Sequence, residues 1–331
     1  MQPTLRPSPR NPQPSPRALT SSTVRALLAL TLLTILLAPT LAPAPALAQG
    51  TDAPGLFGCT PSGDTLCLQR GRFAVTVVWQ TFFGTSGPGV PRPVTDHTGA
   101  FWFFDPNSLE LMVRIVDTRA QNGYFGVFYG SVTNVGFGLT VTDTATGQVL
   151  AFVNPLGTFA GGGLAEAFAA DPGPGTVPAP LTLWTEPAGR PGESTPGGTE
   201  LSVVAGGSSL ASPATRTPPC TAATGLCLVD DRFLMEVTWQ TPQDVSRRGF
   251  AVSLTPDTGA FWLTRPADLE VFVRIVDGRA LNGSFWVLAG SLALPTFELK
   301  VTDTATGALN TYLVPAGTFA SIVDLNAFPG N

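Results

Sequence analysis

Residues 72–80, RFAVTVVWQ, carry the alternation that decides the fold of this chain. Four apolar side chains fall on one face: Phe73, Val75, Val77 and Trp79. They alternate with smaller or polar residues, and this period of two is typical of a strand with one buried face. The pattern returns at residues 232–240, RFLMEVTWQ. We therefore expect both stretches to be strands of sheets that cover an apolar core.

The two stretches belong to an internal repeat with an offset of 160 residues. Shifted by that length, the chain aligns with itself from Cys67 against Cys227 to Phe168 against Phe328, without a gap. Three shared blocks are TGAFW at 98–102 and 258–262, VRIVD at 113–117 and 273–277, and VTDTATG at 141–147 and 301–307. The repeat predicts two copies of one module.

Each copy has the pattern of a protein made of short strands. In copy one, strand-like segments lie near residues 72–80, 90–95, 100–104, 109–117, 124–131, 136–142 and 148–154. Turn signals such as Asn122-Gly123 and the Asp143–Gly147 segment separate them, and no helical stretch intervenes. We expect residues 109–117 to form a half-buried strand. The fold predicted is all-β: two tandem β-sandwich modules of immunoglobulin-like size, with a small barrel as the alternative.

Composition divides the chain into four parts. Residues 1–48 begin with arginines and no acid, continue with an apolar run at 26–38 and end in Ala-Leu-Ala, which predicts a cleaved signal peptide. An uncleaved anchor is the alternative, but the apolar run is shorter than the roughly 20 residues that span a bilayer. Module 1 follows at 49–168 and module 2 at 220–331. The Pro- and Gly-rich segment 169–219 between them is predicted to be a semi-flexible linker, without a docked arrangement of the modules.

The four cysteines lie where the modules begin. In an exported chain, their placement predicts the disulfides Cys59–Cys67 and Cys220–Cys227, each worth about 2 to 3 kcal/mol in the chain-entropy model. A zinc site is the weaker alternative, because no histidine lies near either pair. We expect the mature protein to be secreted or extracellular, with the periplasm or the cell surface as alternatives.

The charge pattern argues against two classes of partner. Loss of the leader removes four arginines and no acid, which takes the formal net charge from −5 to −9. Lys300 is the only lysine of the chain. Nucleic acid and anionic membrane surfaces both need clustered basic side chains, so we expect no nucleic-acid partner and no polybasic membrane contact. We also expect no membrane span after signal cleavage.

The residues favour a protein that is not an enzyme. His97 is the only histidine, and its counterpart in copy two is Asp257, so we interpret it as an exposed turn residue rather than a catalyst. The acids Glu110, Asp117 and Asp143 recur as Glu270, Asp277 and Asp303. Paired carboxylates would suit a small hydrolase, and loop acids would suit calcium. Each acid has a plainer role in a turn or a surface ion pair, so we predict no catalytic residue, no metal and no cofactor. The glycines at 161–163 are interpreted as a flexible stretch.

Some rings and repeated charges could serve binding instead. The candidates are Trp102, Glu110, Arg114, Trp262, Glu270 and Arg274. Glu110 and Arg114 stand four residues apart on one face of a strand, where we expect them to pair at the surface. The partner would be an unidentified extracellular protein or a glycan.

The shared residues resemble an uncharacterised β-rich repeat module of secreted bacterial proteins. The resemblance rests on Leu66-Cys67-Leu68, Arg72-Phe73, Trp79, Thr98–Trp102, Leu109-Glu110, Val113–Asp117, Arg119, Asn122-Gly123 and Val141–Gly147. It implies an exported accessory or surface module and supplies no catalytic residue. We therefore expect a non-enzymatic exported bacterial protein that acts as an extracellular binding or structural unit. A carbohydrate-binding protein is the first alternative, and a small carboxylate-dependent hydrolase is the second.

Overall fold

The structure is a computed structural model that describes residues 58–170, 220, 225–319 and 321–330. The predicted signal peptide and nearly all of the predicted linker lie outside these residues. Module 1 contains β1 (Thr65–Leu68), β2 (Phe73–Gln80), β3 (Ser86–Pro88), β4 (Val90–Pro93), β5 (Thr98–Trp102), β6 (Leu111–Asp117), α2 (Arg119–Asn122), β7 (Tyr124–Ser131), β8 (Gly136–Asp143), β9 (Val149–Asn154) and β10 (Gly161–Ala169). Module 2 contains β11 (Leu226–Leu228), β12 (Phe233–Gln240), β13 (Ser246–Arg248), β14 (Phe250–Ser253), β15 (Thr258–Trp262), β16 (Leu269–Asp277), α3 (Arg279–Asn282), β17 (Ser284–Ser291), β18 (Phe297–Asp303), β19 (Leu309–Val314) and β20 (Ser321–Pro329).

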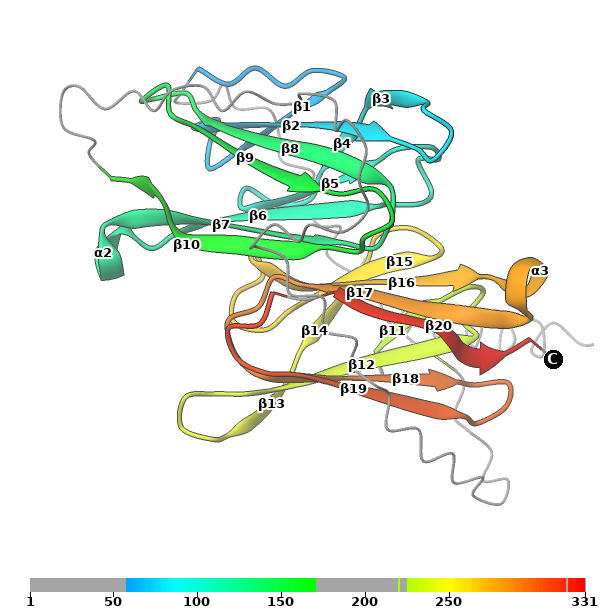
Figure 1. The fold of residues 1–331 in the computed structure, drawn as a ribbon. Coiled ribbons are helices and arrows are strands. Elements are labelled where there is room, and N and C mark those ends of the chain that lie inside the picture. Colours follow the sequence, from blue (N-terminus) through cyan, green and yellow to red (C-terminus); the bar gives the residue numbers. More distant parts are fainter. Residues whose placement is uncertain (1–57, 171–219, 221–224, 320, 331) are drawn as a thin grey trace, which may run out of the picture. The chain divides into compact units, whose positions relative to one another are not determined.

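Each module is a sandwich of two antiparallel sheets (Figure 1). In module 1 one sheet has the order β1-β2-β8-β9, with β3 paired to β2, and the other has the order β10-β7-β6-β5-β4. Module 2 repeats this arrangement with β11-β12-β18-β19, where β13 pairs with β12, and with β14-β15-β16-β17-β20. The predicted all-β fold of two similar sandwich modules is confirmed.

The alternating residues of β2 and β12 fill the two cores. Phe73 and Val75 are completely buried, and the ring of Phe73 meets the edge of Phe125 with 5.0 Å between centroids. Phe233 and Phe285 lie at the same separation in module 2. A fully buried side chain of this kind contributes about 1.5 to 3 kcal/mol through removal of apolar surface from water. The period of two therefore identifies the core correctly.

Both predicted disulfides are confirmed. Cys59 is bonded to Cys67 and Cys220 to Cys227, so each bridge ties the residues before the first strand of its module to that strand. No described residue is a free cysteine. Each disulfide therefore fixes the first strand of its module to the preceding segment by a local covalent link.

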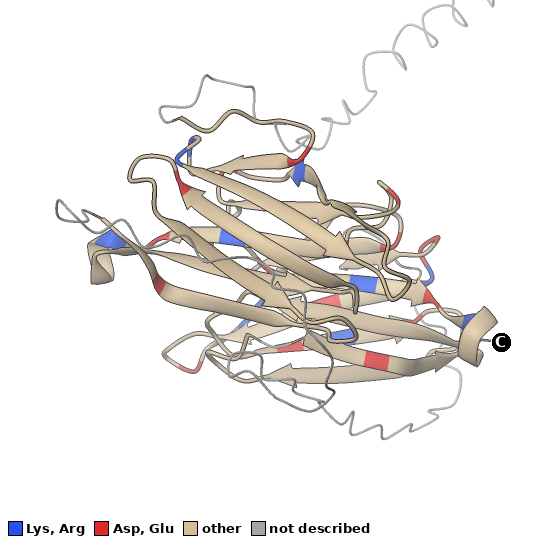
Figure 2. Cartoon of the chain, turned by 45° about the horizontal axis from the view of Figure 1, so that its top comes forward, with Lys and Arg blue, Asp and Glu red and all other residues tan. Residues whose placement is uncertain are grey.

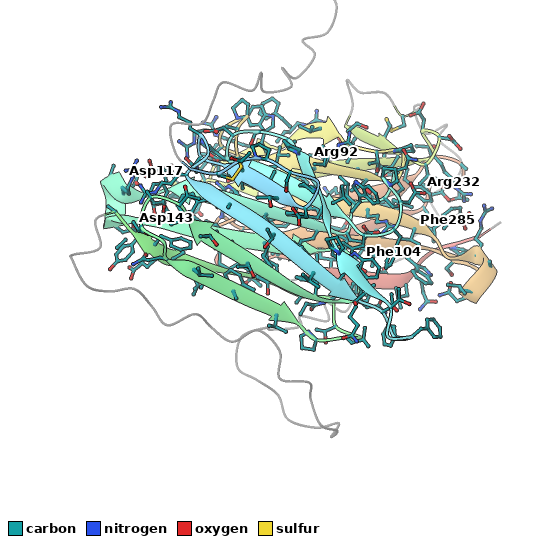
Figure 3. All side chains as sticks on the ribbon, turned by 90° about the horizontal axis from the view of Figure 1, so that it is seen from above. Arg92, Phe104, Asp117, Asp143, Arg232 and Phe285 are labelled. Carbon is teal, nitrogen blue, oxygen red and sulfur yellow. A yellow bond between two sulfur atoms is a disulfide. The ribbon has the colours of Figure 1, made fainter. Side chains whose placement is uncertain are left out.

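A buried ion pair closes one end of each sandwich. In module 1, Arg72 donates to both carboxylate oxygens of Asp143, at 3.1 and 2.8 Å, and its guanidinium lies 4.4 Å from the centre of the Phe125 ring. Arg232 and Asp303 repeat the pair at the same distances. Figure 3 shows Asp143 and Asp117 toward one end of module 1 and Phe104 away from them. The turn interpretation of Asp143 is correct but incomplete, because this acid also anchors an arginine.

Two local predictions are wrong. The glycines at 161–163 form the start of β10, which pairs with β7, rather than a flexible stretch. They suit that strand because a Cβ on Gly163 would collide with the ring of Phe128. The second wrong prediction is the absence of helices, because α2 and α3 are each a single helical turn. The first of these ends at Gly123, whose φ of +83° is the left-handed conformation that glycine adopts without strain.

The prediction that residues 109–117 form a half-buried strand is also wrong. Both faces of β6 are buried, because the second face contributes to an apolar cluster shared by the two modules. The expectation of modules without a docked interface fails for the same reason. This cluster is distinct from the two sandwich cores. It includes Met112 and Phe128 from module 1, and Phe272 and Leu288 from module 2.

Two equivalent glycines mark the closest approach of the modules. Gly130 on β7 and Gly290 on β17 are related by the repeat offset of 160 residues. A Cβ on Gly130 would lie 2.9 Å from the Cα of Gly290, and a Cβ on Gly290 would lie 2.8 Å from the Cα of Gly130. Because equivalent positions meet each other, the interface has approximate two-fold symmetry of the kind found in isologous dimers.

Replacement of Gly130 by alanine tests this close approach. We expect Gly130→Ala to lower the free energy of unfolding by about 1 to 3 kcal/mol, because the backbone of β17 leaves no room for a methyl group. The control is Gly63→Ala, where a Cβ meets nothing within 4 Å. Denaturant unfolding of both variants measures the effect. Equal stability of the two variants would contradict the close approach of the two backbones at Gly130 and Gly290.

Candidate functional site

The repeated arginines form the polar centre of the interface between the modules. Arg114 on β6 reaches across to module 2, where its Nη2 lies 3.4 Å from Glu270 Oε1, and its Nη1 donates to the carbonyl oxygen of Leu292 at 3.0 Å. Arg274 on β16 reaches in the opposite direction, with Nη1 3.6 Å from Glu110 Oε1. Each module thus supplies an arginine to the carboxylate of the other.

The residues around this exchange differ between the copies in a complementary way. His97 Nδ1 lies 2.9 Å from Asp268 Oδ1, whereas the equivalent positions hold Asp257 and Ser108, with the serine hydroxyl donating to Asp257 at 2.7 Å. Two copies of module 2 docked in the same way would place Asp257 beside Asp268, an unfavourable pair of like charges. The substitutions therefore favour pairing of module 1 with module 2 over pairing of identical modules.

The two buried glutamates also receive backbone hydrogen bonds. Glu110 accepts from the N–H of Phe103 at 2.7 Å, and Glu270 accepts from the N–H groups of Leu263 and Thr264 at 2.7 and 3.0 Å. Burial raises the pKa of Glu110 to about 7, although the charge of Arg274 and the Phe103 N–H act in the opposite direction. Glu110 is thus a carboxyl group whose charge is finely balanced near neutral pH.

Asp268 has the opposite balance. Burial would raise its pKa, but the hydrogen bond from His97 and the positive charges of Arg114 and Arg265 outweigh burial and hold its pKa at about 2. His97 lies in the turn between β4 and β5, as predicted, but it is half-buried at the interface rather than exposed.

The structure separates the six predicted binding residues into two groups. Glu110, Arg114 and Glu270 are buried, and the side chain of Arg274 is 16% exposed. The predicted surface pairing of Glu110 with Arg114 is wrong, because each is paired across the interface instead. These four residues join the modules and do not form an exposed binding surface.

Trp102 and Trp262 lie at the rim of the interface and are half-buried. Trp262 stacks on Phe250 of the neighbouring strand, with 3.9 Å between ring centroids and 9° between planes. At the equivalent place in module 1, Trp102 faces Val90. Phe250 and Trp262 thus form a stack at a position where module 1 has none, and Phe250 is 53% exposed. Module 1 has its stacked pair elsewhere, where Trp79 lies on Phe103 with 6.2 Å between ring centroids.

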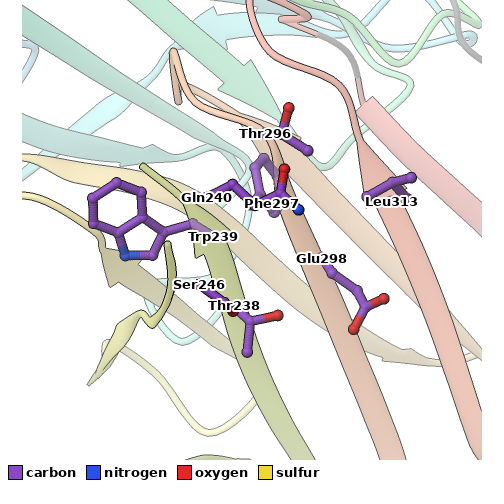
Figure 4. Close-up of a pocket in the computed structure, with 8 residues that line it drawn as sticks. All are labelled: Thr238, Trp239, Gln240, Ser246, Thr296, Phe297, Glu298 and Leu313. Carbon is purple, nitrogen blue, oxygen red and sulfur yellow. The ribbon is translucent and has the colours of Figure 1, made fainter. Parts of the chain in front are cut away.

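A cavity of about 470 Å³ opens beside this pair. Its lining includes Trp239 of β12, Arg247 and Arg248 of β13, and the rings of Phe250 and Trp262. Trp239 also lines a neighbouring cavity of about 230 Å³, in which Thr238, Gln240 and Ser246 supply polar groups (Figure 4). Glu110 and Glu270 line neither cavity. Sequence reasoning missed this site, although the change from Gly87 in copy one to Arg247 in copy two was a signal for it.

The remaining charged groups are sparse along the strands (Figure 2). Asp117, considered above for calcium, pairs with Arg119 at 2.7 Å, and this partner lowers its pKa. The described residues contain no cluster of three or more His, Cys, Asp or Glu side chains suited to a metal ion. Within the same residues, no helix has the length and apolar character needed to cross a membrane.

Comparisons with known proteins give no relative for this chain: no family model, no curated protein and no solved structure matches it. Its function must therefore be argued from its own residues.

Removal of one interface arginine should destabilise the protein strongly. We expect Arg114→Ala to cost about 3 to 5 kcal/mol, because Glu270 and Asp268 would remain buried with one cation fewer. Arg119→Ala is the control, since it breaks an exposed pair worth less than about 1 kcal/mol. Chemical denaturation of the two variants provides the comparison, and equal losses of stability would refute the assigned role of Arg114.

Glu110 should make stability depend on pH. Its pKa in the folded protein, about 7, exceeds the usual 4.5, so folding takes up a proton between these values. The stabilising contribution is complete below pH 4.5 and is lost as the pH rises through 7. Between pH 5 and 8, wild type should lose up to about 3 kcal/mol relative to Glu110→Gln. Urea unfolding at a series of pH values measures this difference, and parallel pH curves for the two proteins would exclude the effect.

Proposed function

We propose that this chain is an exported bacterial protein without catalytic activity, whose paired β-sandwich modules act as one extracellular binding or structural unit. The observation that carries this proposal is the use of the repeated polar residues. Both copies share an arginine and a glutamate at the interface, and these charges hold the modules together: Arg114, Arg274, Glu110 and Glu270. Because the repeated charged residues serve docking, they indicate a scaffold that presents surfaces rather than two copies of a catalytic site.

Export is supported by two independent features. The first 48 residues have the charge and apolar pattern of a signal peptide. The two disulfides are of the kind that persists in oxidising compartments outside the cytosol. We assign the mature protein to the outside of the cell on these grounds, with the cell surface and the periplasm as narrower alternatives.

Carbohydrate binding is the second candidate function. The stacked pair Phe250 and Trp262 favours it, because a planar aromatic surface beside polar groups is suited to the apolar face of a sugar ring. The hydrolase alternative has weaker support. The raised pKa of Glu110 resembles that of a general acid, but this residue faces Arg274 across the interface and lines neither cavity.

A substrate screen tests the absence of catalysis. The mature chain and its Glu110→Gln and Glu270→Gln variants are incubated with broad panels of glycosidase and esterase substrates. We expect all three proteins to match the buffer blank, because both glutamates serve the interface. Turnover by wild type that disappears in a folded glutamine variant would overturn the proposal in favour of the hydrolase.

A further inference from the structure

The cavity beside Phe250 contains a buried donor that lacks a partner. Trp239 is 8% exposed, and no atom of the described residues accepts a hydrogen bond from its Nε1. A buried unpaired N–H costs about 1 to 3 kcal/mol relative to a satisfied one. Trp239 lines both cavities, and because its Nε1 is itself buried, a ligand could offer the missing acceptor after a small movement of the indole.

The first copy shows how this donor is normally satisfied. Trp79, the equivalent of Trp239, donates its Nε1–H to the carbonyl oxygen of Pro88 at 3.0 Å. Its ring lies over Gly87, where a Cβ would come within 2.8 Å of a ring carbon. Position 247 in the second copy is arginine, opposite Trp239 in the strand pairing. Any side chain at position 247 would collide with an indole placed as in copy one, and in copy two the indole N–H is unpaired.

Two further differences between the copies concern the same cavity. Phe250 replaces Val90 and stacks on Trp262, whereas copy one has its exposed ring at Phe104, which contacts Trp79. Arg247 and Arg248 replace Gly87 and Pro88 and bring two exposed cations to a chain of negative net charge. Arg248 forms an ion pair with Glu236 at 3.0 Å, whereas Arg247 lies on the cavity wall with an exposed side chain.

The three differences between the copies suit one class of ligand. A stacked aromatic pair suits the apolar face of a sugar ring, an indole N–H donates to a hydroxyl or ring oxygen, and a guanidinium fork binds a carboxylate through two hydrogen bonds. The volume of about 470 Å³ lies within the range of small-ligand sites. We propose that the cavity lined by Trp239, Arg247, Phe250 and Trp262 binds a glycan that contains uronic acid. This proposal rests on the binding function proposed above and names the ligand class.

Calorimetric titration of the mature chain tests the site directly. The probes are a trimer of galacturonic acid, its methyl ester and a trimer of galactose. We expect the acid trimer to bind at least about tenfold more tightly than the two neutral trimers, a difference of about 1.4 kcal/mol. Binding of all three probes with equal affinity, or of none, would overturn the assignment of an acidic sugar.

Substitution of copy two residues by those of copy one tests where the ligand binds. Arg247→Gly and Phe250→Val introduce the residues of copy one, and Trp239→Phe removes only the indole N–H. Each should weaken binding of the acid trimer about tenfold or more. Trp79→Phe is the matched control in module 1 and should leave the affinity unchanged. Equal affinities of wild type and the three module 2 variants would show that the sugar binds elsewhere.

Three outcomes separate this inference from the broader proposal. If the acid trimer fails but an array of other glycans or of extracellular proteins shows a ligand that Phe250→Val abolishes, the ligand class is wrong while the binding function stands. If an acidic peptide displaces the trimer and binds more tightly, the site recognises protein and the glycan assignment falls. If no ligand binds and the variants behave as wild type, this site has no role in binding and the inference is overturned.

Discussion

The exchange of arginine and glutamate between the modules is the interaction on which the rest of this structure depends. Arg114 meets Glu270, and Arg274 meets Glu110, so each module places a buried glutamate within reach of an arginine of the other. A buried ion pair of this kind adds less net stability than its geometry suggests, but the loss of one partner is costly. The interaction therefore specifies how the modules pair more than it strengthens the pair.

This constraint explains why the copies have diverged where they have. The two glycines at the interface remain glycine because backbones meet there. His97 and Asp268 in one half, and Asp257 and Ser108 in the other, satisfy each other only when unlike modules dock. β13 contributes no residue to the cluster shared by the modules, and there the second copy has two arginines. The aromatic stack beside it is closer to the interface, because Val252 of β14 and the ring of Trp262 also pack in that cluster. The proposed ligand site therefore adjoins the docking surface, and Trp262 belongs to both.

Much of the fold could be predicted because local chemistry decides it. The period of two at residues 73–80 marks a core strand, and the spacing of the cysteines predicts both disulfides. The strand at 161–169 was missed because its glycines give no apolar signal; they are there to admit rings from a neighbouring strand. The half-buried interpretation of residues 109–117 failed because the second face is covered by residues about 160 positions away.

By itself the sequence determined the repeat, the β-sandwich class and the covalent links, since periodicity, offset and spacing are properties of the chain. Only the tertiary structure decided what the repeated charges do. Glu110 and Arg114 lie close in sequence and were expected to pair, but the strand presents both to the other module, where a low-dielectric interface makes cross-module pairing necessary. The unpaired N–H of Trp239 likewise appears only in the tertiary structure, where Arg247 stands opposite this residue in the strand pairing.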